Sequence, residues 1–155
     1  MGNKITVTTI VLKDNFSAVK DALKKDALEK AAMAAGQVVE AHAKINANRV
    51  FSSKSTGGAG LAGSIQTVLS YSDDNRAEVD IGPTVIYGRA QELGAVIRPV
   101  FKKFLHFFVD GQEVFTKMVH LLPHPYLRPA VDENLDEIRD AAGFQIKKAI
   151  EESLK

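Results

Sequence analysis

A long stretch of helical periodicity near the start of the chain constrains the fold most strongly. Apolar residues recur there at steps of three and four, lysines occupy the other side, and no proline interrupts the pattern. The pattern predicts one amphipathic helix of about thirty residues, roughly 45 Å long. Asp14 or Asn15 is its expected N-cap, and Gly36 is its one weak position. The apolar positions are Phe16, Val19, Leu23, Ala27, Ala31, Ala34, Val38, Ala41 and Ile45.

The size of the chain makes the length of this helix informative. With 155 residues, we expect a single domain over residues 1–155. A compact domain of that length is about 40 Å across, so the helix would span or overhang it. The many alanines of the stripe permit a close neighbour. That neighbour is either the C-terminal helix of the same chain or a helix of another subunit.

Patterns of β-structure lie on both sides of the middle of the chain. Residues 5–12 are rich in β-branched side chains and predict a strand. Residues 65–70 and 77–81 alternate around the turn Asp73-Asp74-Asn75, which predicts a hairpin. Residues 104–119 contain a second hairpin, because Asp110-Gly111 is a strong two-residue turn signal.

Helical patterns complete the expected fold. Residues 85–93 predict a short helix stopped by Gly94. A last amphipathic helix follows the prolines at 123, 125 and 129. The fold class is therefore α+β, with an antiparallel sheet of about four to five strands flanked by a long N-terminal helix and a C-terminal helix. The apolar stripe of the last helix is Val131, Leu135, Ile138, Ala142, Ile146 and Ala149.

A segment rich in glycine and serine separates the long helix from the first hairpin. Residues 52–64 hold four glycines and four serines, a composition typical of a flexible loop, which we expect over 52–63. No Gly-Lys-Ser/Thr follows the glycines, so the segment is not a good phosphate-binding loop.

No constellation of residues predicts catalysis, a cofactor or a metal ion. The chain has no cysteine, which excludes disulfides and cysteine-based metal or redox chemistry. His120 and His124 are four residues apart, but Pro123 prevents a helix from presenting both on one face. Glu92 near Tyr87 suggests at most a small hydrolase, whereas a solvated or ion-paired glutamate explains the residue more simply.

Charge is balanced in total and segregated locally. The net charge is +1, but residues 98–128 hold five basic and two acidic residues, whereas residues 132–155 hold seven acidic and four basic ones. Opposite patches suit head-to-tail contact between copies. Arg98, Lys102 and Lys103, with the neighbouring phenylalanines, would alternatively suit a nucleic-acid-binding module. No apolar run is long enough to span a membrane.

Four short elements, in order, carry a resemblance to a known family. Leu61–Ile65 matches "G.L..SI", and Gly82 with Tyr87–Gly94 matches "vG…YA..lE.G". Residues 103–115 fit the hairpin that follows, and Pro123–Ala130 matches "P..PFLRPA". Together they resemble the head–tail joining, tail-completion or neck proteins of long-tailed bacteriophages. Gly88 in place of alanine, Tyr126 in place of phenylalanine, and Gly94-Ala95 in place of Gly-Thr depart from the family pattern.

The resemblance implies a structural virion protein rather than an enzyme, with no cofactor. It implies a ring, usually hexameric, that joins the tail tube or tail terminator to the head connector or adaptor. The protein would lie in the tail or neck of the virion, and in the host cytoplasm during assembly. Direct contact with nucleic acid is not expected, and the loop 52–63 and the hairpin 101–122 become candidate contact segments.

The candidate interface residues come from these same elements. Tyr126 and Leu127 are expected to anchor either the core or the ring interface, and Arg128 to pair with an acidic residue of its own or a neighbouring subunit. The full set of candidates is Lys54, Leu61, Tyr87, Arg89, Glu92, Arg98, Lys102, Lys103, Tyr126 and Arg128.

Overall fold

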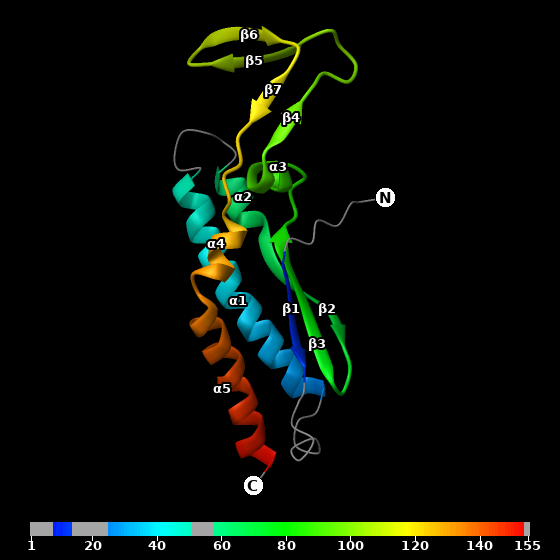
Figure 1. Ribbon diagram of the computed structural model, residues 1–155, viewed down its shortest axis with the longest axis vertical. Coiled ribbons are helices and arrows are strands. Elements are labelled where there is room, and N and C mark those ends of the chain that lie inside the picture. The colour runs from blue at the N-terminus through cyan, green and yellow to red at the C-terminus, as the bar shows by residue number, and fades with distance from the viewer. Residues whose placement is uncertain (1–7, 14–24, 51–57, 154–155) are drawn as a thin grey trace.

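The computed structural model describes residues 8–13, 25–50 and 58–153, and its fold is α+β as predicted (Figure 1). Two long helices dominate it: α1 (Lys25–Val50) and α5 (Leu135–Ser153). The start and cap predicted for the first helix lie outside the described residues. Three short helices complete the set, namely α2 (Gly58–Ser64), α3 (Gly88–Leu93) and α4 (Leu127–Asp132).

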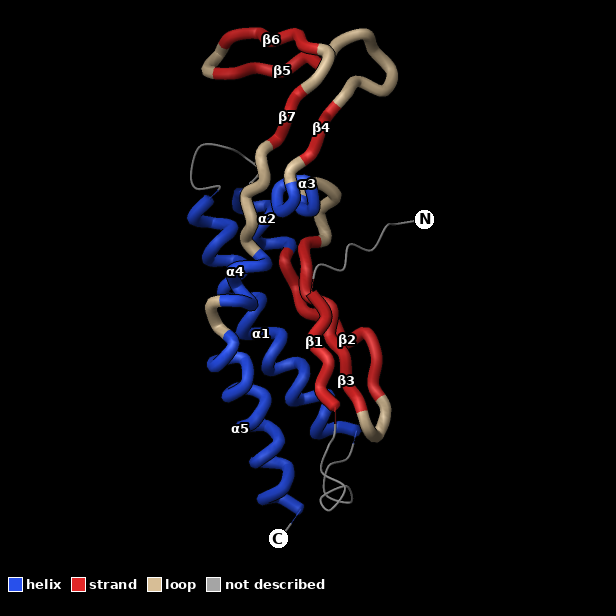
Figure 2. The backbone as a smooth tube through the Cα atoms, viewed as in Figure 1, coloured by secondary structure: helices blue, strands red, loops and turns tan. Residues whose placement is uncertain are grey.

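The described strands are all antiparallel and form three small sheets (Figure 2). The four to five strands expected in one sheet are thus divided, because the later strands extend away from the helices and have no common face to cover. The largest sheet has the order β1-β3-β2, and β4 pairs with β7 and β5 with β6. The strand bounds are β1 (Thr8–Lys13), β2 (Ile65–Ser72), β3 (Arg76–Pro83), β4 (Ala95–Ile97), β5 (Leu105–Val109), β6 (Gln112–Thr116) and β7 (Val119–Leu121).

Helix α1 lies between α5 on one side and the three-stranded sheet on the other (Figure 1). The neighbour that its alanines accommodate is therefore the C-terminal helix of the same chain, one of the two alternatives that the sequence left open. A helix covered on two sides needs small side chains on both, which explains the many alanines. The buried residues of α1 are Ala27, Leu28, Ala31, Ala32, Ala35, Gly36, Val39, Ala43 and Ala47.

The predicted apolar stripe is correct at Ala27 and Ala31. In the second half of α1, the buried residues lie on a different side of the helix from the predicted ones. The structure buries Ala35, Val39, Ala43 and Ala47, whereas Ile45 is 53% exposed. Because alanine occurs on almost every side of α1, hydrophobic periodicity alone does not identify the buried face. The close approach of the sheet and of α5 decides it.

Gly36 is a packing requirement rather than a weak point. A Cβ atom placed there would lie 2.4 Å from Cγ2 of Thr67 on β2. Real Cβ atoms do not approach another carbon so closely, so any side chain would push α1 off the sheet. Glycine therefore sets the spacing between α1 and β2.

Part of the glycine- and serine-rich segment is helical. Residues Gly58–Ser64 form α2, with Leu61 and Ala62 buried in the core. The prediction of a loop is wrong for this part, because burial of Leu61 outweighs the poor helix propensity of glycine. Residues 51–57, including Lys54, lie outside the described residues.

The predicted turns and helix ends agree with the structure. Asp110 and Gly111 have φ angles of 49° and 81°, as a two-residue turn of this kind requires. Gly94, with φ of 75°, follows the last residue of α3. The final helical pattern is split into α4 and α5 around Glu133 and Asn134.

Candidate functional site

A narrow β-structure projects from one end of the helical body (Figure 1). We call it the finger and define it as residues 95–122. Strands β4 and β7 form its stem, and the β5–β6 hairpin forms its tip. The finger leaves the body after α3 and returns just before α4, so these two short helices form its base.

Glu92 holds the base of the finger together. Its side chain is only 4% exposed, and Oε2 accepts hydrogen bonds from the backbone N–H groups of Tyr126 and Leu127 at 2.7 and 3.0 Å. Oε1 accepts a third from the N–H of Arg128 at 3.1 Å. These donors belong to the start of α4, where free N–H groups and the helix dipole favour a negative charge. The carboxylate therefore ties α3 to α4 across the finger.

This arrangement corrects the interpretation of Glu92 as a solvated or ion-paired residue. It also removes the basis for a hydrolase centred on Glu92, since both carboxylate oxygens are occupied by backbone donors. A general base must reach a substrate proton, and a carboxylate buried among its own chain's amides does not.

Tyr126 is the second link between the two sides of the base. It is fully buried, and its hydroxyl donates a hydrogen bond to the carbonyl of Gly88 at 3.2 Å. Burial, together with the negative charge of Glu92, raises the pKa of Tyr126 far above its usual value. A Cβ atom at Gly88 would lie 2.3 Å from Cγ of Pro83, so glycine is needed for the close approach of α3 to the end of β3. The N–H of His124 adds a bond to the carbonyl of Gln91 at 2.7 Å.

The tip of the finger is apolar on both faces. Side chains alternate along a strand, and the register pairs His106 with Phe115 and Phe107 with Val114. His106, Phe108 and Phe115 therefore share one face, on which both phenylalanines are more than 60% exposed. The His106 and Phe115 rings stack at 4.5 Å between centroids. The opposite face carries Leu105, Phe107, Val109 and Val114, with Gln112 and Thr116 at its ends, and Glu113 lies on the first face opposite Phe108.

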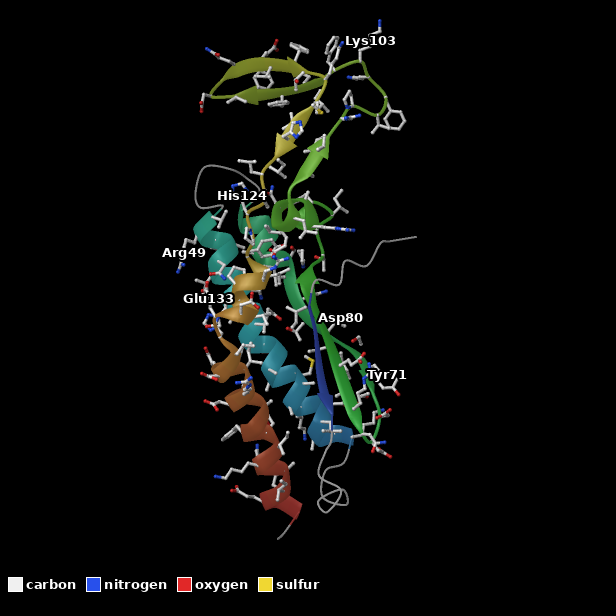
Figure 3. All side chains as sticks on the ribbon, viewed as in Figure 1. Arg49, Tyr71, Asp80, Lys103, His124 and Glu133 are labelled. Atoms are coloured by element: carbon white, nitrogen blue, oxygen red, sulfur yellow. The ribbon has the colours of Figure 1, made fainter. Side chains whose placement is uncertain are left out.

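Basic and apolar side chains also surround the loop between β4 and β5. Phe101 is 98% exposed and Val100 82% exposed. Lys102 and Lys103 are exposed beside them, and Lys103 lies near the tip in Figure 3. Nζ of Lys117 lies 5.9 Å from the centroid of the Phe104 ring. The finger thus combines a positive charge with large exposed apolar side chains.

The outer face of α5 has the opposite charge. Asp136, Asp140 and Phe144 are exposed on it. On the inner side, Nε2 of His42 on α1 lies 2.8 Å from Oε2 of Glu137. This pair links α1 to α5.

The predicted interface residues fall into three groups. Leu61, Glu92 and Tyr126 are buried in this chain, so they act as core and anchoring residues rather than on its surface. Lys54 lies outside the described residues. The other six are exposed at or near the finger: Tyr87, Arg89, Arg98, Lys102, Lys103 and Arg128.

The sequence singled out the hairpin 101–122 as a contact segment, but it predicted neither the exposure of Phe144 nor which face of the hairpin, that of Phe108 and Phe115, is exposed. The signal for Phe144 was its position between the stripe residues Ala142 and Ile146, on the other side of the helix. The signal for the finger was an apolar residue on both faces of a hairpin that has only two strands. Such a hairpin has no interior of its own.

The described residues contain neither a cluster that could hold a metal ion nor a helix that could span a membrane. Within 8–13, 25–50 and 58–153, no three histidine, aspartate or glutamate side chains converge as a metal site would require. None of the helices in that part of the chain is long and apolar enough to cross a bilayer.

Comparison with known proteins identifies one family. Residues 11–94, more than half of the chain, match the HK97-gp10-like family, described as "Bacteriophage HK97-gp10, putative tail-component". The match ends at Gly94, where the finger begins. No curated protein and no solved structure matches the chain.

Proposed function

Because the chain belongs to the HK97-gp10-like family of bacteriophage tail components, we propose that it forms a ring at the head-proximal end of the tail and joins the tail to the head connector. A member of this family is a structural protein of the virion and not an enzyme. The ring, its hexameric state and the identity of its neighbours are the parts that we propose.

The finger is the observation that carries the proposal. A two-stranded hairpin is marginally stable by itself, and this one exposes phenylalanines that no other part of the described chain covers. Exposed apolar patches of this kind are typical of protein–protein contacts. A rigid base at Glu92 and Tyr126 would hold the finger at a fixed angle to the body, as a joining protein needs.

The distribution of charge supports assembly into a ring. The basic residues of the finger and the acidic residues of α5 lie on different surfaces of one molecule. A contact between two different surfaces is head-to-tail, and it closes into a ring when the rotation between copies is suitable. The remaining faces of the ring would bind the tail tube or tail terminator on one side and the connector or adaptor on the other.

Electron microscopy of tails tests the proposal directly. Tails assembled without this protein are expected to lack a ring at the head-proximal end, and adding purified protein is expected to restore it and to permit joining to heads. Tails that carry the same end structure and join heads equally well without the protein would overturn the proposal.

Matched variants connect this test to the finger. Phe108→Ser with Phe115→Ser removes apolar area from the exposed face of the tip, whereas Ile86→Ser changes a 92% exposed residue outside it. The first variant is expected to fail in joining tails to heads and the second to succeed. If the two variants join tails to heads equally well, the exposed face of the finger tip does not make the contact on which joining depends.

A nucleic-acid-binding module is the second candidate. Arg98, Lys102 and Lys103 are exposed near Phe101 and Phe104, a combination that suits phosphates and bases. A gel shift at low salt distinguishes the two functions, since phosphate binding would retard DNA and weaken steeply as salt rises. We expect no retardation, because the basic residues serve protein contacts in the proposed ring.

A further inference from the structure

We propose that the finger of one copy docks on the outer face of α5 of the next copy. This contact rests on the proposed self-assembly and identifies the two surfaces that would make it. The partner is a second copy of this chain. The basic β4–β5 loop and the apolar tip of the finger would meet exposed acidic residues and Phe144 of the helix.

Gly143 is the first observation on the helix side. It lies in the middle of α5, where glycine is among the least favourable residues. A Cβ atom added there would meet no atom within 4 Å, so packing inside the described chain does not require glycine. Gly36, in contrast, is explained by the contact of α1 with Thr67. A bare helix backbone at Gly143 gives a second molecule room for close approach.

Phe144, the next residue, is the second observation. Its side chain is 65% exposed and lies one helical turn after exposed Asp140, on the same side of α5. The apolar stripe that packs on α1 is formed by other residues, including Ile138 and Ala142. Phe144 and Gly143 therefore present a protruding ring beside a gap, a shape that can interlock with the phenylalanines of the finger.

Charge complementarity is the third observation and identifies the partner. Residues 135–144 of α5 hold three acidic residues and one basic residue, whereas the finger holds four basic and two acidic ones. Asp136 and Asp140 are exposed on α5, and Lys102 and Lys103 are exposed on the finger. The basic β4–β5 loop of the finger is attracted to an acidic helix face and repelled by a basic one, so the charges favour one pairing and one orientation.

The arrangement of the molecule makes this contact intermolecular. The finger projects from one end of the body, and α5 extends toward the other end (Figure 1). The two surfaces do not meet within one chain. Repeated between copies, the contact is head-to-tail and uses each surface once in every subunit.

Cross-linking tests the contact, and the absence of cysteine makes the chain well suited to it. The full-length variant Lys103→Cys/Asp140→Cys is treated with a short bismaleimide. Each copy then links to two neighbours, and we expect a ladder of covalent multimers beyond the dimer. Each single-cysteine variant is expected to give no product larger than a dimer.

The control variant keeps the cysteine in the finger and moves the second cysteine off α5. Lys103→Cys/Ser70→Cys places the second cysteine on exposed Ser70 of β2, away from α5. A ladder from the first pair alone supports the proposal. No ladder, or equal ladders from both pairs, overturns it.

The cross-linking result is separable from the test of function. If rings at the tail end are seen but the ladder is absent, the proposed function stands and this contact is wrong. If the ladder forms but tails acquire no ring, the contact stands and the joining function is wrong.

Discussion

The Oε2 atom of Glu92 accepts the backbone N–H of Tyr126 at 2.7 Å, although 34 residues separate them in the chain. The whole finger lies between these two residues. One buried carboxylate therefore closes the base of the projection and caps α4 at the same time. Both the stability of the base and the direction of the finger therefore depend on the Glu92 carboxylate.

Glu92→Ala is expected to lower the free energy of unfolding by about 2–4 kcal/mol. The substitution leaves three backbone N–H groups at the base without their acceptor, and each unsatisfied buried group costs roughly 1–3 kcal/mol before the chain relaxes. Urea denaturation measures the loss. Glu133→Ala, at an exposed position after α4, is the matched control and should change little. Equal effects of the two would contradict the anchoring role.

Two glycine-to-alanine substitutions are expected to act in opposite directions. Gly36→Ala forces a Cβ atom toward Thr67 and should cost about 1–3 kcal/mol, despite the better helix propensity of alanine. Gly143→Ala meets nothing within the described chain and should stabilise it by roughly 0.5–1 kcal/mol. Thermal or urea unfolding checks both. In the proposed assembly, Gly143→Ala would also weaken association, which sedimentation measures separately.

The buried tyrosine is expected to make the protein sensitive to high pH. The pKa of Tyr126 is raised in the folded state, so the unfolded chain loses this proton first, near pH 10. Stability should be complete below that pH and fall as pH rises above it. Unfolding measured between neutral pH and strongly alkaline pH tests this. Tyr126→Phe should flatten the decline. Tyr71→Phe should do so less, because the pKa of this exposed tyrosine is raised chiefly by a surface hydrogen bond to Asp73.

Glu40 gives the corresponding expectation at low pH. Its burial opposes ionisation, but hydrogen bonds from Lys44 at 2.5 Å and from the Thr67 N–H at 2.7 Å outweigh it, so the pKa lies below the usual 4.5. The unfolded chain takes up the proton first as pH falls. Stability is thus present above pH 4.5 and lost below it. Glu40→Gln should weaken this acid dependence, and the exposed control Glu151→Gln should leave it unchanged.

Charge reversal is expected to separate the finger contact from general electrostatics. Lys102→Glu/Lys103→Glu should weaken self-association about tenfold or more at low salt, since it places like charges opposite the acidic helix face. Adding Asp136→Lys/Asp140→Lys should restore association. The control Lys25→Glu/Lys30→Glu makes the same change of charge on α1. Sedimentation measures all of these variants, and failure of the double reversal to rescue would count against the pairing.

Much of the fold could be predicted from local sequence patterns. The Asp110-Gly111 turn, the hairpin around Asp73 and the end of α3 at Gly94 are set by backbone chemistry within a few residues. The candidate site was harder to predict from the sequence. Glu92 looked like a surface residue because its three donors are more than thirty residues away along the chain.

The sequence by itself determined the α+β class, the long α1, the amphipathic α5 and the uneven charge, because periodicity and composition act over short distances. Only the tertiary structure decided which face of α1 is buried, why Gly36 and Gly88 carry no side chain, and that α2 replaces a loop. It also decided that Glu92 is an internal anchor. Each of these depends on which distant segments approach within contact distance, and a pattern along one segment does not contain that information.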